Sequence, residues 1–106
     1  MAERLLKDGH TVVGVDCFTD YYPRAIKESN LAGFRDHAQF RFHERDLAEG
    51  NLGALVAGAD YVFHLAAMPG LTRSWVDFDI YARCNLTATH RLLEVLKGLK
   101  SLKKFV

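Results

Sequence analysis

The pattern of hydrophobic positions along the chain predicts strands separated by helices. Apolar, β-branched runs without polar alternation occur at Thr11–Val15 and Tyr61–Leu65, and such runs are typical of strands covered on both faces. Gln39–His43 alternates polar and aromatic residues, which indicates a strand with its two phenylalanines on one face. Lys104–Val106 has the character of a strand opening. Four strands are therefore expected.

Helical signals flank these strands. Ala2–Lys7 favours helix, and Gly9 follows it where a left-handed cap is wanted. Gly50–Val56 suits a short helix or turn. A long helix is expected over about Ser74–Lys97, ended by Gly98, because apolar residues recur there at steps of three and four. The residues of this face are Tyr81, Cys84, Ala88, Leu92, Val95 and Leu99.

A further helix is expected between the first two strands. Asp20 is placed to cap it, Pro23 suits its first turn, and it runs to about Leu31 with Gly33 as a stop. Helices and strands then alternate along the chain. This order favours the α/β class, a Rossmann-type doubly wound parallel sheet with helices on both faces.

Composition narrows the function classes. With 106 residues the chain is one domain at most, and a net charge of +1 provides no field for nucleic acid. Cys17 and Cys84 show no metal or redox spacing, as expected of a reduced cytoplasmic protein without a structural disulfide. No apolar run has the length of a signal or membrane segment. A metal, a membrane or a nucleic acid is therefore not expected as a partner.

The first candidate site residue lies directly after the first strand. Ligands of such sheets bind at the carboxyl ends of the strands. Asp16 can accept both hydroxyls of an adenosine ribose and repel a 2′-phosphate, and Cys17 and the two residues after it add no cation. This favours NAD over NADP. The alternative is a loop aspartate that caps the next helix.

Two further strand ends carry candidates. Asp46 and Leu47 end the second strand, where side chain and backbone can meet an adenine edge, although Asp46 alone also fits a surface charge. Leu65, Ala66 and Ala67 follow the third strand, and small residues there allow the backbone to approach a cofactor closely. Tight helix packing is the alternative for the alanines.

The fourth candidate lies within the long helix. The amide of Asn85 can bind the strand-end loops and hold them in shape, whereas many mid-helix asparagines are simply exposed. His64 is interpreted as a hydrogen-bonded histidine at the end of a strand, not as a catalyst.

Taken in order and spacing, these segments resemble the extended short-chain dehydrogenase/reductase family, which includes the NAD-dependent epimerases and dehydratases. The resemblance rests on Gly9–Asp16, Arg45-Asp46-Leu47, Phe63–Ala67, and Tyr81–Glu94 with its Asn85-Leu86-Thr87-Ala88-Thr89 core. It covers nearly the whole chain. The aromatic-rich segment Asp16–Tyr22 is most similar to the UDP-glucose and UDP-glucuronate 4-epimerase branch.

The resemblance implies a set of roles. Asp16 would hold the adenosine ribose of NAD, Asp46 and Leu47 the adenine, and Leu65–Ala67 the phosphate and nicotinamide side, with Asn85 supporting the loop. Arg73 and Ser74 lie where related enzymes approach the cofactor or the sugar nucleotide. The long helix at 74–97 contributes to a two-helix homodimer interface in this family. The family reaction is transient hydride transfer between a nucleotide-sugar and NAD, with a tyrosine as acid/base.

Several family motifs have no match in the chain. No Gly-x-x-Gly-x-x-Gly turn is present, and the strand expected between those at Val12 and Val62 is missing. No tyrosine has a lysine four positions later, so no catalytic residue is assigned. The residues found there are Ala25 after Tyr21, Ile26 after Tyr22, Leu65 after Tyr61 and Asn85 after Tyr81. Two hypotheses result: a fragment of an NAD-dependent sugar-nucleotide epimerase or dehydratase that is inactive as written, or a non-catalytic Rossmann-like module that binds a nucleotide or a partner.

Overall fold

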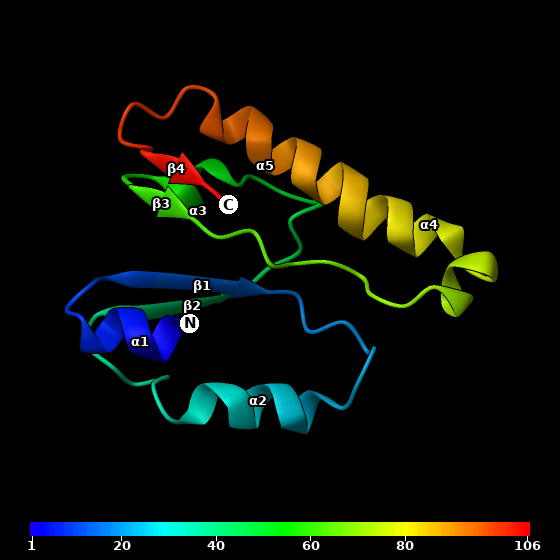
Figure 1. The fold of residues 1–106 in the computed structure, drawn as a ribbon, viewed down its shortest axis with the longest axis horizontal. Helices are drawn as coiled ribbons and strands as arrows, with labels where there is room; N and C mark the ends of the chain where they lie inside the picture. The colour runs from blue at the N-terminus through cyan, green and yellow to red at the C-terminus, as the bar shows by residue number, and fades with distance from the viewer. The chain divides into compact units, whose positions relative to one another are not determined.

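A computed structural model describes residues 1–106. The chain divides into two compact units, Met1–Arg45 and Asp46–Val106, and each has its own pair of parallel strands and its own helices (Figure 1). The predicted α/β class is confirmed. The strands form two separate two-stranded sheets, with order β1-β2 and β3-β4.

Unit 1 is a helix followed by a strand–helix–strand motif. Its elements are α1 (Ala2–Lys7), β1 (Val12–Asp16), α2 (Arg24–Ala32) and β2 (Phe40–Glu44). The strands run parallel, and the register pairs their last residues, Asp16 and Glu44. Gly9 follows α1 with φ +84°, the left-handed conformation predicted for it. The carboxyl ends of both strands therefore lie at one edge of the sheet.

The packing of unit 1 explains a glycine within a strand. A Cβ atom on Gly14 would lie 3.0 Å from Phe40 Cζ and 3.6 Å from Phe42 Cδ2. Both rings therefore lie on the face predicted from the alternation of β2. Phe40 is buried and meets Phe34 edge-on, with ring centroids 4.9 Å apart. This aromatic cluster occupies the space that a side chain at position 14 would need.

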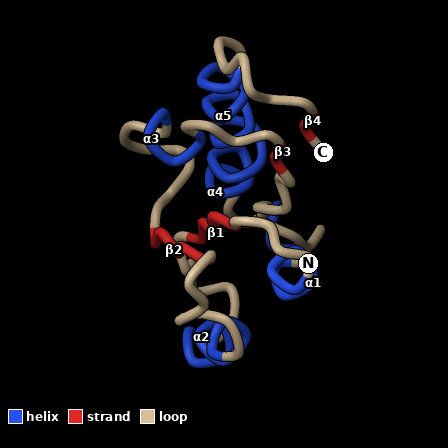
Figure 2. The backbone as a smooth tube through the Cα atoms, turned by 90° about the vertical axis from the view of Figure 1, so that its left-hand side faces the viewer, coloured by secondary structure: helices blue, strands red, loops and turns tan.

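Unit 2 packs a long helical segment near the second strand pair (Figures 1 and 2). Its elements are α3 (Gly53–Val56), β3 (Tyr61–Val62), a 3₁₀ turn (Thr72–Trp75), α4 (Phe78–Tyr81), a π-helical turn (Ala82–Thr87), α5 (Ala88–Leu96) and β4 (Lys104–Phe105). β3 and β4 are parallel. The core of unit 2 is formed by Val56, Leu92 and Leu96, against which Leu47, Val62, Val95, Leu99, Leu102 and Phe105 pack. No helix is both long and apolar enough to cross a membrane.

The predicted long helix differs from the observed one at its start and in its middle. It begins at Phe78 rather than Ser74, because Asp77 caps it by accepting a hydrogen bond from the Ile80 N–H. A π-helical turn then separates α4 from α5. The predicted buried face is nevertheless largely confirmed, since Tyr81, Ala88 and Leu92 are all buried. The last helical residue is Leu96, just before the predicted end.

The start of α2 was also predicted wrongly. Pro23, not Asp20, occupies the N-cap position, and no side chain caps the helix. Pro23 has φ −52° and ψ 133°, so the backbone there is still extended and the first helical residue is Arg24. The ring of proline fixes φ, and its side chain has no oxygen that could accept from the free N–H groups of the first helical turn.

The expectation that the strands are covered on both faces is wrong. Val13 in β1 is 45% exposed, Tyr61 in β3 is 55% exposed, and Leu65 is 71% exposed. The strand predicted at Tyr61–Leu65 ends at Val62. Each strand has a single strand neighbour, and a two-stranded sheet leaves side chains uncovered that a wider sheet would bury.

Candidate functional site

The predicted site residues divide between the two units. In unit 1, Asp16 is the last residue of β1 and the half-buried Cys17 follows it. The others belong to unit 2, and they are Asp46, Leu47, Leu65, Ala66, Ala67, Arg73, Ser74 and Asn85. No group of three or more His, Cys, Asp or Glu side chains is arranged to hold a metal ion. The candidate residues therefore form two sets, one in each unit.

Asp16 organises the turn after β1. Its Oδ1 accepts a hydrogen bond from the Phe18 N–H at 2.6 Å and an ion pair from Lys27 Nζ at 3.4 Å. Both contacts use Oδ1, and the side chain is 47% exposed, so Oδ2 remains available to a hydroxyl group. Asp16 does not cap α2, and the alternative interpretation of this residue is wrong.

Lys27 is a cation that the sequence analysis missed. It comes from α2 and is only 7% exposed. Its ammonium group lies 5.0 Å from the ring centroid of Tyr22 and 5.6 Å from that of Phe18. The aromatic rings and the carboxylate of Asp16 together compensate for its burial. Lys27 therefore partly neutralises the negative charge of Asp16. The three residues that follow Asp16 in the sequence give no sign of this cation.

Phe18 fixes the conformation of the same turn. Its φ of 51° is left-handed, which is uncommon for a residue with a side chain. The ring packs on Phe42 at 5.4 Å between centroids, and the guanidinium of Arg24 lies 4.6 Å from its centre. Arg24 also binds both carboxylate oxygens of Glu44, at 2.8 and 2.7 Å. This pair holds the pKa of Glu44 below its usual range, and β1, β2 and α2 are joined at this edge.

Asp46 is held from two sides. Its Oδ1 accepts from the Ala48 N–H at 2.7 Å, and its Oδ2 pairs with Arg83 Nη1 at 2.8 Å. Arg83 also bonds Glu49 through Nη2. Asp46 is thus a partnered and mostly buried carboxylate, with 23% of its side chain exposed, and not a solvated surface charge. The side chain of Leu47 packs against the core of unit 2, so only its backbone is left for a ligand.

Asn85 holds the loop after β3. Its Oδ1 accepts from the Met68 N–H at 2.7 Å, and its Nδ2 donates to the Met68 carbonyl at 3.1 Å. One helical turn earlier, the Tyr81 hydroxyl donates to the Pro69 carbonyl at 2.9 Å. The side chain of Met68 is buried, with 4% exposed. Asn85 therefore makes the loop contacts proposed for it, and the alternative of a merely exposed asparagine is wrong.

A second chain of hydrogen bonds joins the end of β3 to the helix. Thr89 Oγ1 donates to the Asn85 carbonyl at 2.7 Å and lies 2.8 Å from His64 Nε2. Because the threonine proton is used, His64 donates from Nε2. Burial lowers the pKa of His64, which favours this neutral form. Between His64 and Met68 the chain presents Leu65, Ala66 and Ala67, all exposed.

Arg73 and Ser74 lie in the 3₁₀ turn that precedes α4. Ser74 Oγ donates to the Leu71 carbonyl at 2.5 Å, which uses its hydroxyl proton within the turn. Arg73 is exposed. Neither side chain contacts the other predicted site residues in unit 2.

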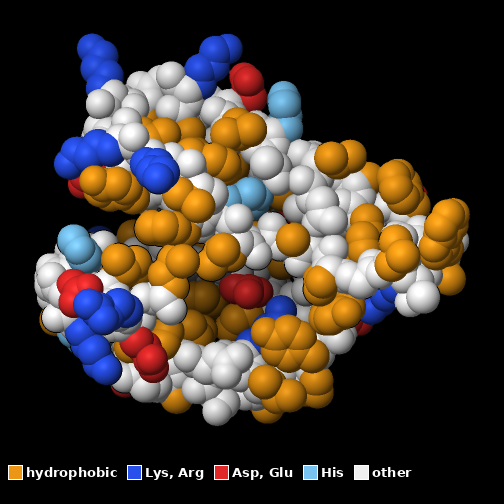
Figure 3. All heavy atoms as spheres, viewed as in Figure 1, with side chains coloured by type: hydrophobic (Ala, Val, Ile, Leu, Met, Phe, Trp, Pro, Cys, Tyr) orange, Lys and Arg blue, Asp and Glu red, His pale blue; other side chains and the backbone are white.

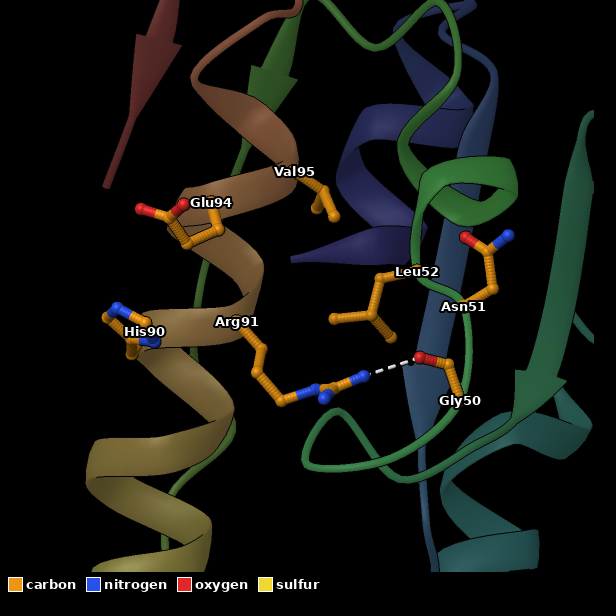
Figure 4. A pocket seen from close by; sticks show the side chains of 7 residues that line it. All are labelled: Gly50, Asn51, Leu52, His90, Arg91, Glu94 and Val95. Atoms are coloured by element: carbon orange, nitrogen blue, oxygen red, sulfur yellow. Dashed lines mark hydrogen bonds between the residues drawn. The ribbon is translucent and has the colours of Figure 1, made fainter.

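A groove of about 410 Å³ lies elsewhere in unit 2 (Figure 4). It is lined by Gly50, Asn51, Leu52, His90, Arg91, Glu94 and Val95. Arg91 reaches from α5 toward the loop and donates to the Gly50 carbonyl, while its buried Nε has no partner. None of these residues belongs to the predicted cofactor set.

The chain matches known proteins along its whole length. The family model described as GDP-mannose 4,6 dehydratase matches residues 1–106. An uncharacterized UDP-glucose epimerase of Bacillus subtilis, YtcB, is 39% identical over 108 residues, covering 100% of this chain and 34% of that protein. The UDP-glucuronate 4-epimerase of Thermodesulfobacterium geofontis is 34% identical, covering 96% of this chain and 33% of the relative. The chain thus spans about a third of the length of these relatives.

Solved structures give the same result. The UDP-glucuronic acid 4-epimerase of Bacillus cereus, in complex with UDP-glucuronic acid and NAD, superposes with a TM-score of 0.91 at 37% identity, covering 97% of this chain and 33% of that one. The Bordetella bronchiseptica enzyme WbmF, in complex with NAD⁺, has a TM-score of 0.78 at 32% identity, covering 98% of this chain and 30% of that one. Both similarities confirm the Rossmann-type fold.

Proposed function

Since the chain belongs to the GDP-mannose 4,6-dehydratase family, we propose that it is the cofactor-binding segment of an NAD-dependent sugar-nucleotide epimerase or dehydratase. The observation that carries the proposal is the whole-length similarity to enzymes solved with NAD, such as the Bacillus cereus epimerase. The substrate of the complete protein is then a nucleotide-sugar. The chain covers a third of such enzymes, so we assign it the role of a fragment.

In unit 1 the residues present fit the ribose of a dinucleotide. Asp16 keeps Oδ2 for a ribose hydroxyl, while Oδ1 is held by the Phe18 N–H and by Lys27. Cys17 follows at the same turn. A 2′-phosphate would meet the carboxylate of Asp16, which favours NAD over NADP. The neighbouring ammonium of Lys27 weakens the repulsion between Asp16 and a 2′-phosphate. The preference for NAD therefore depends on the part of the Asp16 charge that Lys27 leaves uncompensated.

In unit 2 the residues fit the adenine and the remainder of the dinucleotide. Asp46 offers its remaining lone pairs and Leu47 its backbone to the adenine. Leu65–Ala67 offers an exposed, small-residue backbone beside the anchored Met68. Asn85 positions this loop rather than touching the ligand. Arg73 and Ser74 are assigned to the approach of the nucleotide-sugar only by the family resemblance.

We assign no catalytic residue to the chain. NAD, when bound, supplies hydride acceptance and return. Proton transfer requires a positioned acid/base, and no tyrosine here has a lysine four positions later. The chain on its own is therefore proposed to be inactive, with the acid/base pair and the nucleotide-sugar domain supplied by other segments of the complete protein.

The alternative is a non-catalytic Rossmann-like module that binds a nucleotide or a partner chain. The coding sequence on either side separates the two. A glycine-rich turn upstream and a Ser…Tyr-x-x-x-Lys array downstream support the enzyme, whereas stop codons on both sides would leave only the free-standing module.

Titration of the isolated chain with NAD is a second test. Pyrophosphate binding in such folds depends on a glycine-rich turn at a helix N-terminus, which this sequence does not contain. We expect no binding detectable at about 1 mM NAD, on the order of −4 kcal/mol or weaker. Micromolar binding would show that these two units suffice for a cofactor site. The complete protein is the positive control, and it should bind NAD.

A homodimer through the helical segment at 74–97 is part of the proposal. Large apolar side chains are exposed along it, among them Phe78 at 65%, Leu86 at 66% and Leu93 at 45%. Figure 3 shows hydrophobic side chains at the surface over this helical segment. Analytical ultracentrifugation of the complete protein tests this: Leu86→Glu should shift the dimer toward monomer, and Lys103→Glu, outside the helix, should not. A cytoplasmic location also stays a prediction, checked by imaging a tagged complete protein.

A further inference from the structure

The π-helical turn Ala82–Thr87 carries two side chains that hold two different loops. Asn85 bonds the backbone of Met68 in the loop after β3. Arg83, two residues earlier, pairs with Asp46 in the loop that follows β2. π-turns within helices are frequent at functional sites, where they redirect side chains. One turn of helix thus anchors the loop that contains Asp46 and the loop after β3, both of which belong to unit 2.

Arg83 fixes the orientation of Asp46. Its Nη1 lies 2.8 Å from Asp46 Oδ2, and its Nη2 bonds Glu49 in the same loop. The second oxygen of Asp46 accepts from the Ala48 N–H at 2.7 Å. An ionised carboxylate has about four acceptor positions and no donor. Two positions are occupied here, so what Asp46 still presents is purely an acceptor.

A carboxylate in a fixed position can distinguish purine bases by the group that they carry at position 6. The exocyclic amino group of adenine donates hydrogen bonds, whereas the corresponding carbonyl oxygen of hypoxanthine is an acceptor and is repelled by a carboxylate. From this we infer that Arg83 is a positioning residue that sets the selectivity of the site for adenine over 6-oxo purines, acting through Asp46. The inference rests on the proposed function, in that a dinucleotide is the ligand.

The test compares two dinucleotides on the complete protein: NAD and nicotinamide hypoxanthine dinucleotide. Calorimetry gives both dissociation constants for the parent protein, Arg83→Gln, Arg83→Lys and a control, Arg4→Gln. Arg4 serves as the control because it is also an arginine paired with a carboxylate, Asp8, and it does not belong to the predicted site. We expect the preference for NAD to fall by about fivefold in Arg83→Gln, since Asp46 loses one of its two anchors. Arg83→Lys should retain part of the preference, and Arg4→Gln all of it.

The outcomes separate the two proposals. If the parent protein binds NAD and Arg83→Gln weakens both dinucleotides equally, Arg83 is only structural and the inference is overturned. If neither dissociation constant changes, the inference is overturned as well, and in both cases the proposed function stands. If the parent protein binds neither dinucleotide, the proposed function fails and the inference with it. Should Arg83→Gln melt early, the ratio measured for Arg83→Lys decides, because lysine keeps the charge without the two-pronged contact.

Discussion

Replacing Asn85 with alanine removes the side chain that holds the backbone of Met68. Two hydrogen bonds are lost, the Met68 N–H to Oδ1 at 2.7 Å and Nδ2 to the Met68 carbonyl at 3.1 Å. A typical intramolecular hydrogen bond contributes about 1 kcal/mol, and a buried donor left without a partner costs ~1–3 kcal/mol. Met68 is only 4% exposed, so water restores little of the loss. The free energy of unfolding should therefore fall by about 2–4 kcal/mol.

Urea unfolding of the complete protein, followed by circular dichroism, measures this change. Asn85→Asp is the matched variant, since it keeps the acceptor for the Met68 N–H but replaces the donor with a carboxylate oxygen that the Met68 carbonyl repels. It should therefore also lose stability, because one hydrogen bond is replaced by a contact between two acceptors. The denaturant dependence should stay the same, so that only the midpoint moves. A loss below ~0.5 kcal/mol in Asn85→Ala would refute the reasoning, because surface substitutions already span that range.

Other substitutions test the remaining contacts. Lys27→Met should strengthen discrimination against NADP by up to about fivefold in binding assays, because it leaves the charge of Asp16 uncompensated; an unchanged NAD/NADP ratio contradicts this. Gly14→Ala should destabilise by ~1–3 kcal/mol in urea unfolding, since its Cβ would lie 3.0 Å from Phe40 Cζ, and a gain in stability would refute the crowding. Burial lowers the pKa of His64, so the unfolded chain binds that proton more readily. Stability should therefore decline as the pH falls below about 6.5, and His64→Gln should flatten this decline in thermal unfolding at several pH values.

The order of elements was predictable because it rests on local patterns. Strand ends, the left-handed Gly9 and the buried helix face follow from β-branched runs, glycine and apolar spacing. The π-helical turn was not predictable from the sequence. Apolar residues at steps of three and four are compatible with a continuous α-helix and also with a helix that contains one extra residue in a π-turn. The true start at Phe78 depends on whether Asp77 or an earlier residue caps the helix. Strand burial was misjudged because it depends on how many strands each sheet contains.

Candidate site residues were proposed where a residue stands near a strand end. Asp16 and Asp46 were proposed in this way and stay predictions as ligand contacts, while the contacts of Asn85 agree with its expected role in holding a loop. Lys27 and Arg83 were missed, since a charged residue on a helix usually signals a solvated face. Their partners are distant in sequence: Lys27 reaches Asp16 across 11 residues, and Arg83 reaches Glu49 across 34. Only the fold brings such charges together.

The two side chains of the π-helical turn differ in what they contribute. Asn85 is neutral and bonds a buried backbone, so its contribution is to stability and is insensitive to salt. Arg83 is 43% exposed and acts through charge, a contribution that dissolved ions screen. An exposed ion pair contributes little to the free energy of folding, about 0–1 kcal/mol. It can still orient Asp46, the proposed ligand-binding side chain, without changing the packing of the core. Added salt should therefore lower the preference of the complete protein for NAD over the hypoxanthine dinucleotide. The contribution of the Asn85 hydrogen bonds to the free energy of unfolding should stay the same. Stability and selectivity thus come from neighbouring residues of one helical turn.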